Sequence, residues 1–247
     1  MTNEQILTCA INIGEQLLIN GAEISRVEDT ISRICSAYGV RQSHIFSIAS
    51  CIIVSLETAD GEWITQTRRI LNYGTNMYKL DRLNNLSRKI CSEHPSRQTI
   101  EEEFDAIVKS KEYPPALQVA VSAMVAAAFT VFFGGTLRDG LAAAFVGALL
   151  KLTLYGLQSM KMKQIFSNII CSILSGLLCI FVCFAGLGQH LDTIMIGNIM
   201  LLIPGVLLTN SFRDFISGLL HFSEAIITAV CVAGGFIIAI ILTGGSL

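Results

Sequence analysis

The second part of this chain consists of apolar stretches that are long enough to cross a membrane. Residues 114–247 contain only five Lys/Arg and four Asp/Glu side chains, whereas residues 1–113 contain twelve and fifteen. Charged residues make up 15% of the whole chain, against about 25% in a typical soluble protein. We therefore expect a membrane α-helical protein with a polar domain over residues 1–113 and a transmembrane domain over residues 114–247, divided at Pro114-Pro115.

Five apolar segments follow these prolines. They cover about residues 115–133, 141–155, 165–187, 193–209 and 225–242, and the second can continue toward Met160. Segments of about 17–25 residues suit a hydrocarbon core about 30 Å thick. Pro204-Gly205 interrupts the fourth segment, and proline removes a backbone donor and clashes with the preceding turn. The sequence therefore predicts five transmembrane helices, the fourth of them broken at Pro204-Gly205.

The polar domain has the pattern of a compact α+β fold of order ααβββαα. Apolar residues recur at helical spacing over residues 6–18 and 24–38, and β-prone runs surround an Asp60-Gly61 turn, which is typical of a hairpin. Two further helices are expected, over about Met77–Cys91 and Ile100–Ser110. Thr99 and Glu102 have the spacing of a capping box, which places the start of the last helix there.

The Lys and Arg residues of the short connections predict the orientation, because they are enriched on the cytosolic side. The second connection between spans holds Lys161 and Lys163, and the fourth holds Arg213. The first has Arg138 beside Asp139, and the third has neither Lys nor Arg. We expect a multi-pass protein of the cytoplasmic membrane with a cytosolic N-terminal domain and no signal peptide.

Polar residues in or beside the spans are the candidates for a substrate or ion path, because such residues are costly in a bilayer and broken helices there surround binding sites. They are Asn198, Asn210, Asp214 and Glu224, together with the break itself, Pro204 and Gly205. Lys151 of the second span and Glu23 and Arg26 of the polar domain are secondary candidates.

Each candidate also has a structural interpretation. Asp214 and Glu224 can be interfacial charges, and Glu23 and Arg26 can belong to a solvated face with local ion pairs. Asn198 can bond a neighbouring helix, Lys151 can extend to the inner surface, and Pro204-Gly205 can be a packing kink. Asn210 can cap a helix that begins at Ser211. In that helix Asn210 and Asp214 would lie one turn apart, beside free amides that suit an anion.

Several functional classes lack their motifs. The sequence has no Walker loop, no H-E-x-x-H and no G-x-S-x-G, so neither an enzyme nor an ATP-driven pump is expected. Its eight cysteines include no C-x-x-C pair, and we expect no metal site and no cofactor. No basic tract indicates nucleic-acid binding.

Two motifs resemble those of the bacterial threonine/serine exporter family. The first is Gly21-Ala22-Glu23 followed by Arg26 and Glu28, and the second is the PG-x-x-L-x-NS-x-x-D-x-x-x-G run from Pro204 to Gly218. The resemblance covers essentially the whole chain. It implies export, with this chain similar to the larger component of a split form whose smaller membrane partner supplies the missing spans. The split pair is linked to succinate, so the resemblance implies an amino acid or a dicarboxylate as the substrate.

Two hypotheses follow. The first is an export carrier driven by an ion gradient, working with the smaller partner or as a homo-oligomer, with alternating access around the broken span and Asp214 or Glu224 as proton carriers. The alternative is a membrane-tethered enzyme or sensor whose cytosolic domain carries the activity. Five spans with a central break exceed what an anchor needs, which favours transport.

Overall fold

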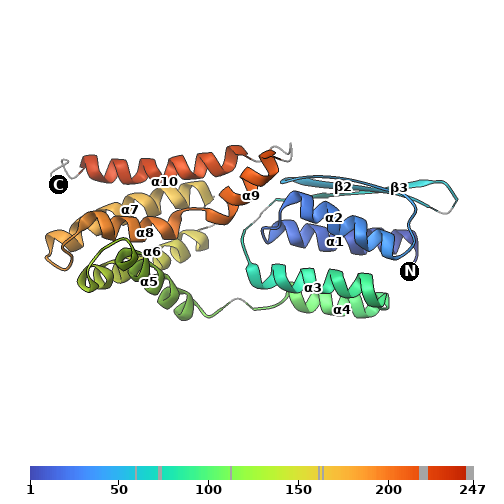
Figure 1. Ribbon diagram of the computed structural model, residues 1–247, viewed down its shortest axis with the longest axis horizontal. Coiled ribbons are helices and arrows are strands. Elements are labelled where there is room, and N and C mark those ends of the chain that lie inside the picture. Colours follow the sequence, from blue (N-terminus) through green and yellow to red (C-terminus); the bar gives the residue numbers. More distant parts are fainter. Residues whose placement is uncertain are drawn as a thin grey trace. The chain divides into compact units, whose positions relative to one another are not determined.

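The computed structural model describes residues 1–58, 60–71, 74–111, 113–160, 162, 164–216 and 222–242. The chain forms two compact units (Figure 1). Unit 1 contains Met1–Lys111 and Val206–Ser223, and unit 2 contains Glu112–Gly205 and Glu224–Leu247. The described part is mostly helical, with one three-stranded sheet near the N-terminus.

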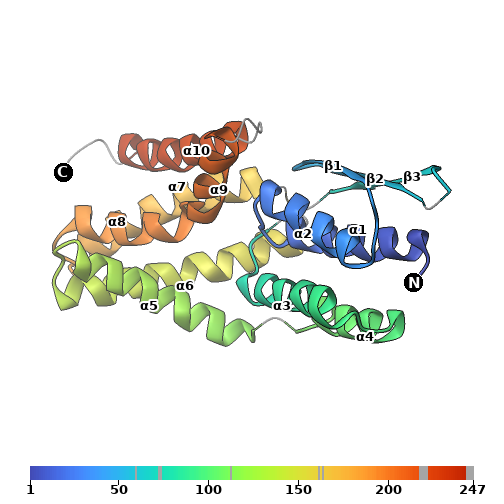
Figure 2. The ribbon, with the colours of Figure 1, turned by 45° about the vertical axis from the view of Figure 1, so that its right-hand side comes forward.

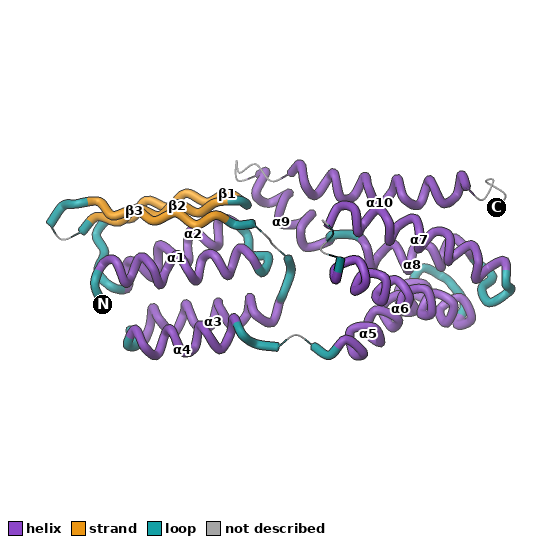
Figure 3. Tube along the Cα trace, turned by 180° about the vertical axis from the view of Figure 1, so that it is seen from behind, coloured by secondary structure: helices purple, strands orange, loops and turns teal. Residues whose placement is uncertain are grey.

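Unit 1 is built in three layers: a sheet, a middle pair of helices and an outer pair (Figures 2 and 3). The elements of its N-terminal part are α1 (Asn3–Ile19), α2 (Ile24–Ala37), β1 (Ser43–Ile48), β2 (Cys51–Glu57), β3 (Trp63–Arg69), α3 (Met77–Glu93) and α4 (Arg97–Val108). The predicted order ααβββαα is confirmed. The sheet is antiparallel, in the order β1-β2-β3. Gly61 has φ +80° in the β2–β3 connection, which explains the Asp-Gly signal.

The core of unit 1 extends from the sheet across the middle helices to the outer pair. Strand alternation puts Ile52, Val54 and Leu56 of β2 against this core, where each is fully buried, while Ile53 faces outward. Leu7 and Ile31 are the fully buried counterparts on α1 and α2. The polar N-terminal part of the chain therefore has a hydrophobic core of its own.

One predicted helix start in unit 1 is wrong. α4 begins at Arg97, and its N-cap is Ser96, whose hydroxyl accepts a hydrogen bond from the Thr99 amide at 3.3 Å. Ser96 lies three residues before Thr99 and offers a cap of the same kind. Thr99 and Glu102 therefore lie inside the helix and do not form its capping box.

Unit 2 consists of α5 (Pro115–Phe132), α6 (Leu137–Ser159), α7 (Gln164–Phe184), α8 (Leu191–Leu202) and α10 (Phe222–Leu242). Residues 206–223, between α8 and most of α10, belong to unit 1. Within the described residues, three helices, α5, α6 and α7, are long and apolar enough to cross a membrane. A fourth is added if α8 and α9 (Gly205–Ile216) are counted as one broken span. In α10 the apolar stretch of the described residues, Thr228–Leu242, is shorter than such a span. Five spans remain a prediction.

Small residues let the helices of unit 2 approach closely. A Cβ atom added to Gly197 of α8 would lie 2.0 Å from Thr130 Oγ1 of α5. A Cβ atom on Gly235 of α10 would lie 2.4 Å from Ser172 Cβ of α7, and one on Gly176 would lie 2.5 Å from Ala239 Cβ. Such contacts are typical of membrane helix pairs, which associate by close packing.

Candidate functional site

The helix break is where the sequence predicts it. α8 ends at Leu202, Ile203 is extended (φ −67°, ψ 124°), and α9 begins at Gly205. Pro204 stands just before α9, where its missing amide removes no helical hydrogen bond. The prediction of a helix beginning at Ser211 is therefore wrong, because the helix begins at Gly205, directly after the proline and six residues before Ser211. Asn210 lies inside α9 and is not its cap.

Unit 1 brings the two sequence motifs into contact. The side-chain amide of Asn210 donates a hydrogen bond to the Gly21 carbonyl at 3.0 Å, and the Arg213 guanidinium pairs with the Glu23 carboxylate. Gly21 has φ +96°, a conformation that favours glycine, and Glu23 precedes α2. The segment that connects α1 to α2 thus binds α9.

Arg26 and Glu28 of the first motif have other surroundings. Arg26 is exposed on α2, and the Glu28 carboxylate accepts a hydrogen bond from the Ser47 amide at 2.7 Å. Burial raises the pKa of Glu28 above its usual value. Asp214 lies in α9 and Glu224 in α10, but the side chains of both lie outside the described residues, as do Lys161 and Lys163.

Asn198 is fully buried in unit 2, between α7 and α8. Its Nδ2 donates to the Ile194 carbonyl of its own helix at 3.0 Å and lies 3.8 Å from Cys179 Sγ of α7. Its Oδ1 is buried without a hydrogen-bond partner among the described residues. A buried acceptor left unpaired costs about 1–3 kcal/mol. Asn198 Oδ1 is therefore able to accept a hydrogen bond from a further group in this apolar interior.

Lys151 lines a cavity of about 440 Å³ between α5, α6 and α8. It is the one charged side chain among the described residues that line this cavity, with Gln118 and Ser122 adding polar groups to mostly apolar walls. Lys151 Nζ lies 5.1 Å from the centre of the Tyr155 ring, a cation–π contact. Leu201 and Leu202 line the same cavity, so it reaches the last residues before the helix break.

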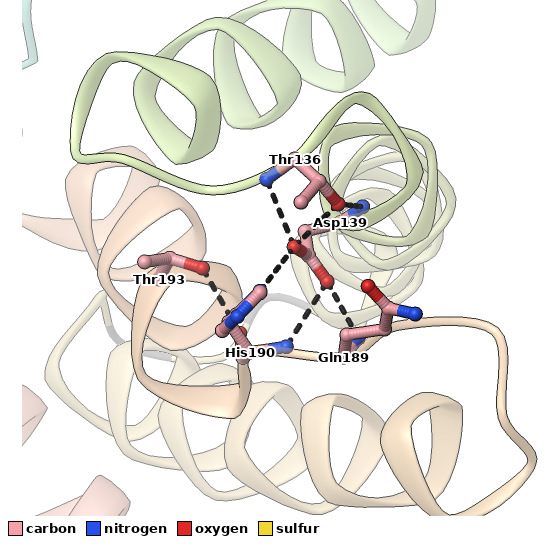
Figure 4. Close-up of polar contacts among 5 residues, drawn as sticks. All are labelled: Thr136, Asp139, Gln189, His190 and Thr193. Carbon is pink, nitrogen blue, oxygen red and sulfur yellow. Dashed lines mark hydrogen bonds and ion pairs between the residues drawn. The ribbon is translucent and has the colours of Figure 1, made fainter.

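A carboxylate at the start of α6 links two connections of unit 2, as Figure 4 shows. Asp139 is fully buried. Its Oδ2 accepts from the Thr136 amide at 2.9 Å, from the Thr136 hydroxyl at 2.7 Å and from His190 Nδ1 at 2.8 Å. Its Oδ1 accepts from the amides of Gln189 at 2.6 Å and His190 at 3.1 Å. Asp139 therefore holds the α5–α6 connection to the α7–α8 connection.

His190 is the exposed member of this network. Its side chain is 53% exposed, and the hydrogen bond to Asp139 raises its pKa above the usual value. In the sequence, Asp139 is only a marker of orientation, and His190 is not among the predicted site residues. Thr136 and Asp139 do have capping-box spacing, but the partner on the other connection lies 51 positions away.

Comparisons with known proteins show the family of this chain. The family model described as "Putative threonine/serine exporter" matches residues 8–243. A protein of Klebsiella aerogenes described as "Probable succinate transporter subunit YjjP" is 27% identical over 211 residues, which cover 82% of this chain and 78% of that protein. No solved structure matches the chain. The match over nearly the whole sequence, together with the apolar helices of unit 2, identifies the protein: it belongs to the threonine/serine exporter family and is a component of a membrane transporter.

Proposed function

We propose that this chain is the larger subunit of an exporter for a small carboxylic acid, either a dicarboxylate of the succinate type or an amino acid of the threonine/serine type. The description of the matching family supports the amino acid, and the description of the Klebsiella relative supports the dicarboxylate. Both substrates carry a carboxylate. The observation that carries the proposal is Lys151 in its largely apolar cavity.

An ammonium group in such surroundings suits a small carboxylate. Its charge acts more strongly there than in water, because the effective dielectric constant is lower. The apolar walls formed by Leu117, Val121 and Leu154 would pack against the carbon chain of the substrate. Lys151 is thus the proposed contact of the carboxylate.

The residues around the break are the proposed path. Asn198 offers an acceptor that has no partner among the described residues of unit 2. Pro204-Gly205 separates α8 from α9, and irregular backbone at such a break allows binding or movement. Asn210 contacts the Gly21 carbonyl. Asp214 and Glu224 supply carboxylates on α9 and α10, and we propose them as members of the path from their positions in the sequence.

Two substitutions test the role of Lys151. Lys151→Met keeps the length of the side chain and removes the charge, so efflux of the substrate from cells or vesicles should fall at least about tenfold, the loss expected when about 1.4 kcal/mol of binding is removed. Lys151→Arg keeps the charge and should retain part of the activity. Lys109→Met, on an exposed ion pair in unit 1, is the control. Export at the wild-type rate by inserted Lys151→Met would refute this role.

The proposed topology has five spans, with the N-terminal domain in the cytosol of a bacterial cell and the chain in the cytoplasmic membrane. The polar composition of residues 1–113 and the lysines of the second connection support it. We further propose an ion gradient as the driving force and no enzymatic activity, since the matching family and the relative are described as transporters. This weakens the alternative of a membrane-tethered enzyme or sensor.

A smaller membrane subunit is the proposed partner. The relative is described as a transporter subunit, which supports a complex of more than one chain. Co-expression with the smaller family member and purification through a tag on this chain should recover both proteins in a fixed ratio. Full transport by the purified chain as a monomer would contradict the proposal.

A further inference from the structure

The Asp139–His190 pair differs from an ordinary helix cap. The bonds from Thr136 to Asp139 are those of a capping box, and the amides of Gln189 and His190 precede α8. These contacts account for a carboxylate at this place. They do not require an imidazole at position 190, whose Nδ1 adds a further donor to an oxygen that already accepts two bonds.

The charges around His190 favour its protonated form. Besides Asp139 of α6, Asp192 in the first turn of α8 acts on it in the same direction. Arg138 of α6 donates to the Gly186 carbonyl of the α7–α8 connection, and α7 contributes the thiol of Cys183, which lies near both aspartates. α5 has no ionisable side chain in its sequence. Among the described residues, the surroundings of His190 therefore contain two carboxylates and one guanidinium.

We propose that His190 is the proton-binding residue of this transporter, and that its protonation locks the α5–α6 connection to the α7–α8 connection through Asp139. The coupling to transport rests on the proposed function, whereas the lock itself does not. Asp139 is buried and held by five bonds, so it gives a fixed counter-charge. The half-exposed imidazole gives the proton a route from water.

The direction of the effect follows from the raised pKa of His190. The folded protein binds this proton more tightly than the unfolded chain, so the pair stabilises the lock fully below about pH 6.5, the ordinary value for histidine. The stabilisation is lost as the pH rises through the raised pKa. A neutral imidazole with its proton on Nδ1 can still donate to Asp139, but without the attraction between opposite charges.

In the proposed topology these two connections face the outside. A proton from the outer solution would then reach His190 without crossing the membrane, as an exchange of outer protons for inner substrate requires. Acid outside would close the lock, and loss of the proton would loosen it. A change in the outer pH would thus change the strength of the bond between His190 and Asp139, which joins both connections.

The first test measures His190 directly, without any transport. The full chain is labelled with ¹⁵N-histidine, and its imidazole signals are titrated by NMR, with His190→Gln identifying the signal and His44→Gln as the control that removes another. The midpoint of His190 should lie above 6.5 and should fall toward that value in Asp139→Asn. A midpoint at or below 6.5, or one that Asp139→Asn leaves unchanged, would overturn the proposal.

The second test measures coupling. In His190→Gln the amide side chain can still donate to Asp139 but does not titrate, so export should continue with a flatter dependence on outer pH between about 6 and 8, on either side of the ordinary pKa of histidine. An unchanged pH dependence would exclude His190 as the proton-binding residue. Absence of export by the wild-type complex would instead count against the proposed function, and the NMR titration would still decide whether the lock exists.

Discussion

The side-chain amide of Asn210 donates a hydrogen bond to the main-chain oxygen of Gly21, 189 positions earlier in the chain. The ion pair between Arg213 and Glu23 lies beside this bond in the sequence. The family resemblance rests on the two segments that hold these residues, and the contact gives both a shared physical role. It fastens the helix after the break to the first pair of helices.

Removal of the Asn210 contact should destabilise unit 1 modestly. Asn210→Ala deletes one hydrogen bond, worth about 0.5–1.5 kcal/mol. Arg213→Gln should cost less than about 1 kcal/mol, because the arginine is 58% exposed. Trp63 is the single tryptophan and lies in β3 of unit 1, so its fluorescence during urea unfolding reports this unit.

Arg26→Ala is the matched control for these variants, because Arg26 is exposed in the same motif. We expect it to leave the unfolding midpoint unchanged. If Asn210→Ala behaves like Arg26→Ala, the contact does not contribute to the stability of unit 1.

Glu28 should give unit 1 a pH-dependent stability. Burial raises its pKa above 4.5, so the folded state holds the proton more tightly and its stability falls as the pH rises from about 4.5 through the raised pKa. Glu28→Gln keeps an oxygen for the Ser47 amide and should remove this fall. Glu28→Ala leaves that amide, in a fully buried residue, without its acceptor and should cost about 1–3 kcal/mol. Urea midpoints at several pH values distinguish the three proteins.

Gly197 should tolerate no side chain. A Cβ atom there would meet Thr130 Oγ1 at 2.0 Å and the Ala126 carbonyl at 2.7 Å, so Gly197→Ala should push α8 away from α5 and cost about 1–3 kcal/mol or more. Gly156→Ala is the control, since a Cβ atom at Gly156 has no neighbour within 4 Å among the described residues. Thermal unfolding of the detergent-solubilised proteins should show a lower midpoint for the first variant alone. Equal midpoints would show that α5 and α8 are not packed through Gly197.

Labelling in intact cells tests the proposed orientation. On a background without the eight native cysteines, single cysteines replace Gln98, Ser159 and Leu187, all of which are exposed. An impermeant thiol reagent should label only the cysteine at Leu187, in the α7–α8 connection. Labelling at Ser159 together with protection at Leu187 would reverse the orientation of unit 2.

Regular elements were predictable from the sequence because they depend on neighbouring residues. The period of the apolar residues predicts α1 and α2, the length of the apolar segments predicts the long helices of unit 2, and the Asp60-Gly61 turn predicts the β2–β3 hairpin. The break at Pro204-Gly205 has the same local origin. The exact start of a helix is harder to predict, because Ser96 and Thr99 are both able to cap α4 and only the contacts of the folded chain select Ser96.

The candidate sites depend on contacts between distant segments, which no local pattern encodes. Asp139 and His190 lie in different connections, and their bond exists only because α6 and α7 bring those connections together. The sequence predicted Asn210 as a helix cap because its actual partner, Gly21, lies near the other end of the chain, where no local pattern indicates it. Lys151 was selected by its charge, but its cavity requires three packed helices.

The division of the chain has a consequence for how the polar part can be isolated. Unit 1 is discontinuous, because residues 206–223 return to it after the chain has passed through α5 to α8. A fragment that ends at Lys111 would lack α9 and leave the Gly21 carbonyl and the Glu23 carboxylate without the partners that α9 supplies. Both ends of residues 206–223 continue into apolar helices of unit 2. The backbone therefore connects the two units at three places, at these two ends and at the Pro114-Pro115 linker, and a displacement of unit 1 would act on the membrane part through all three.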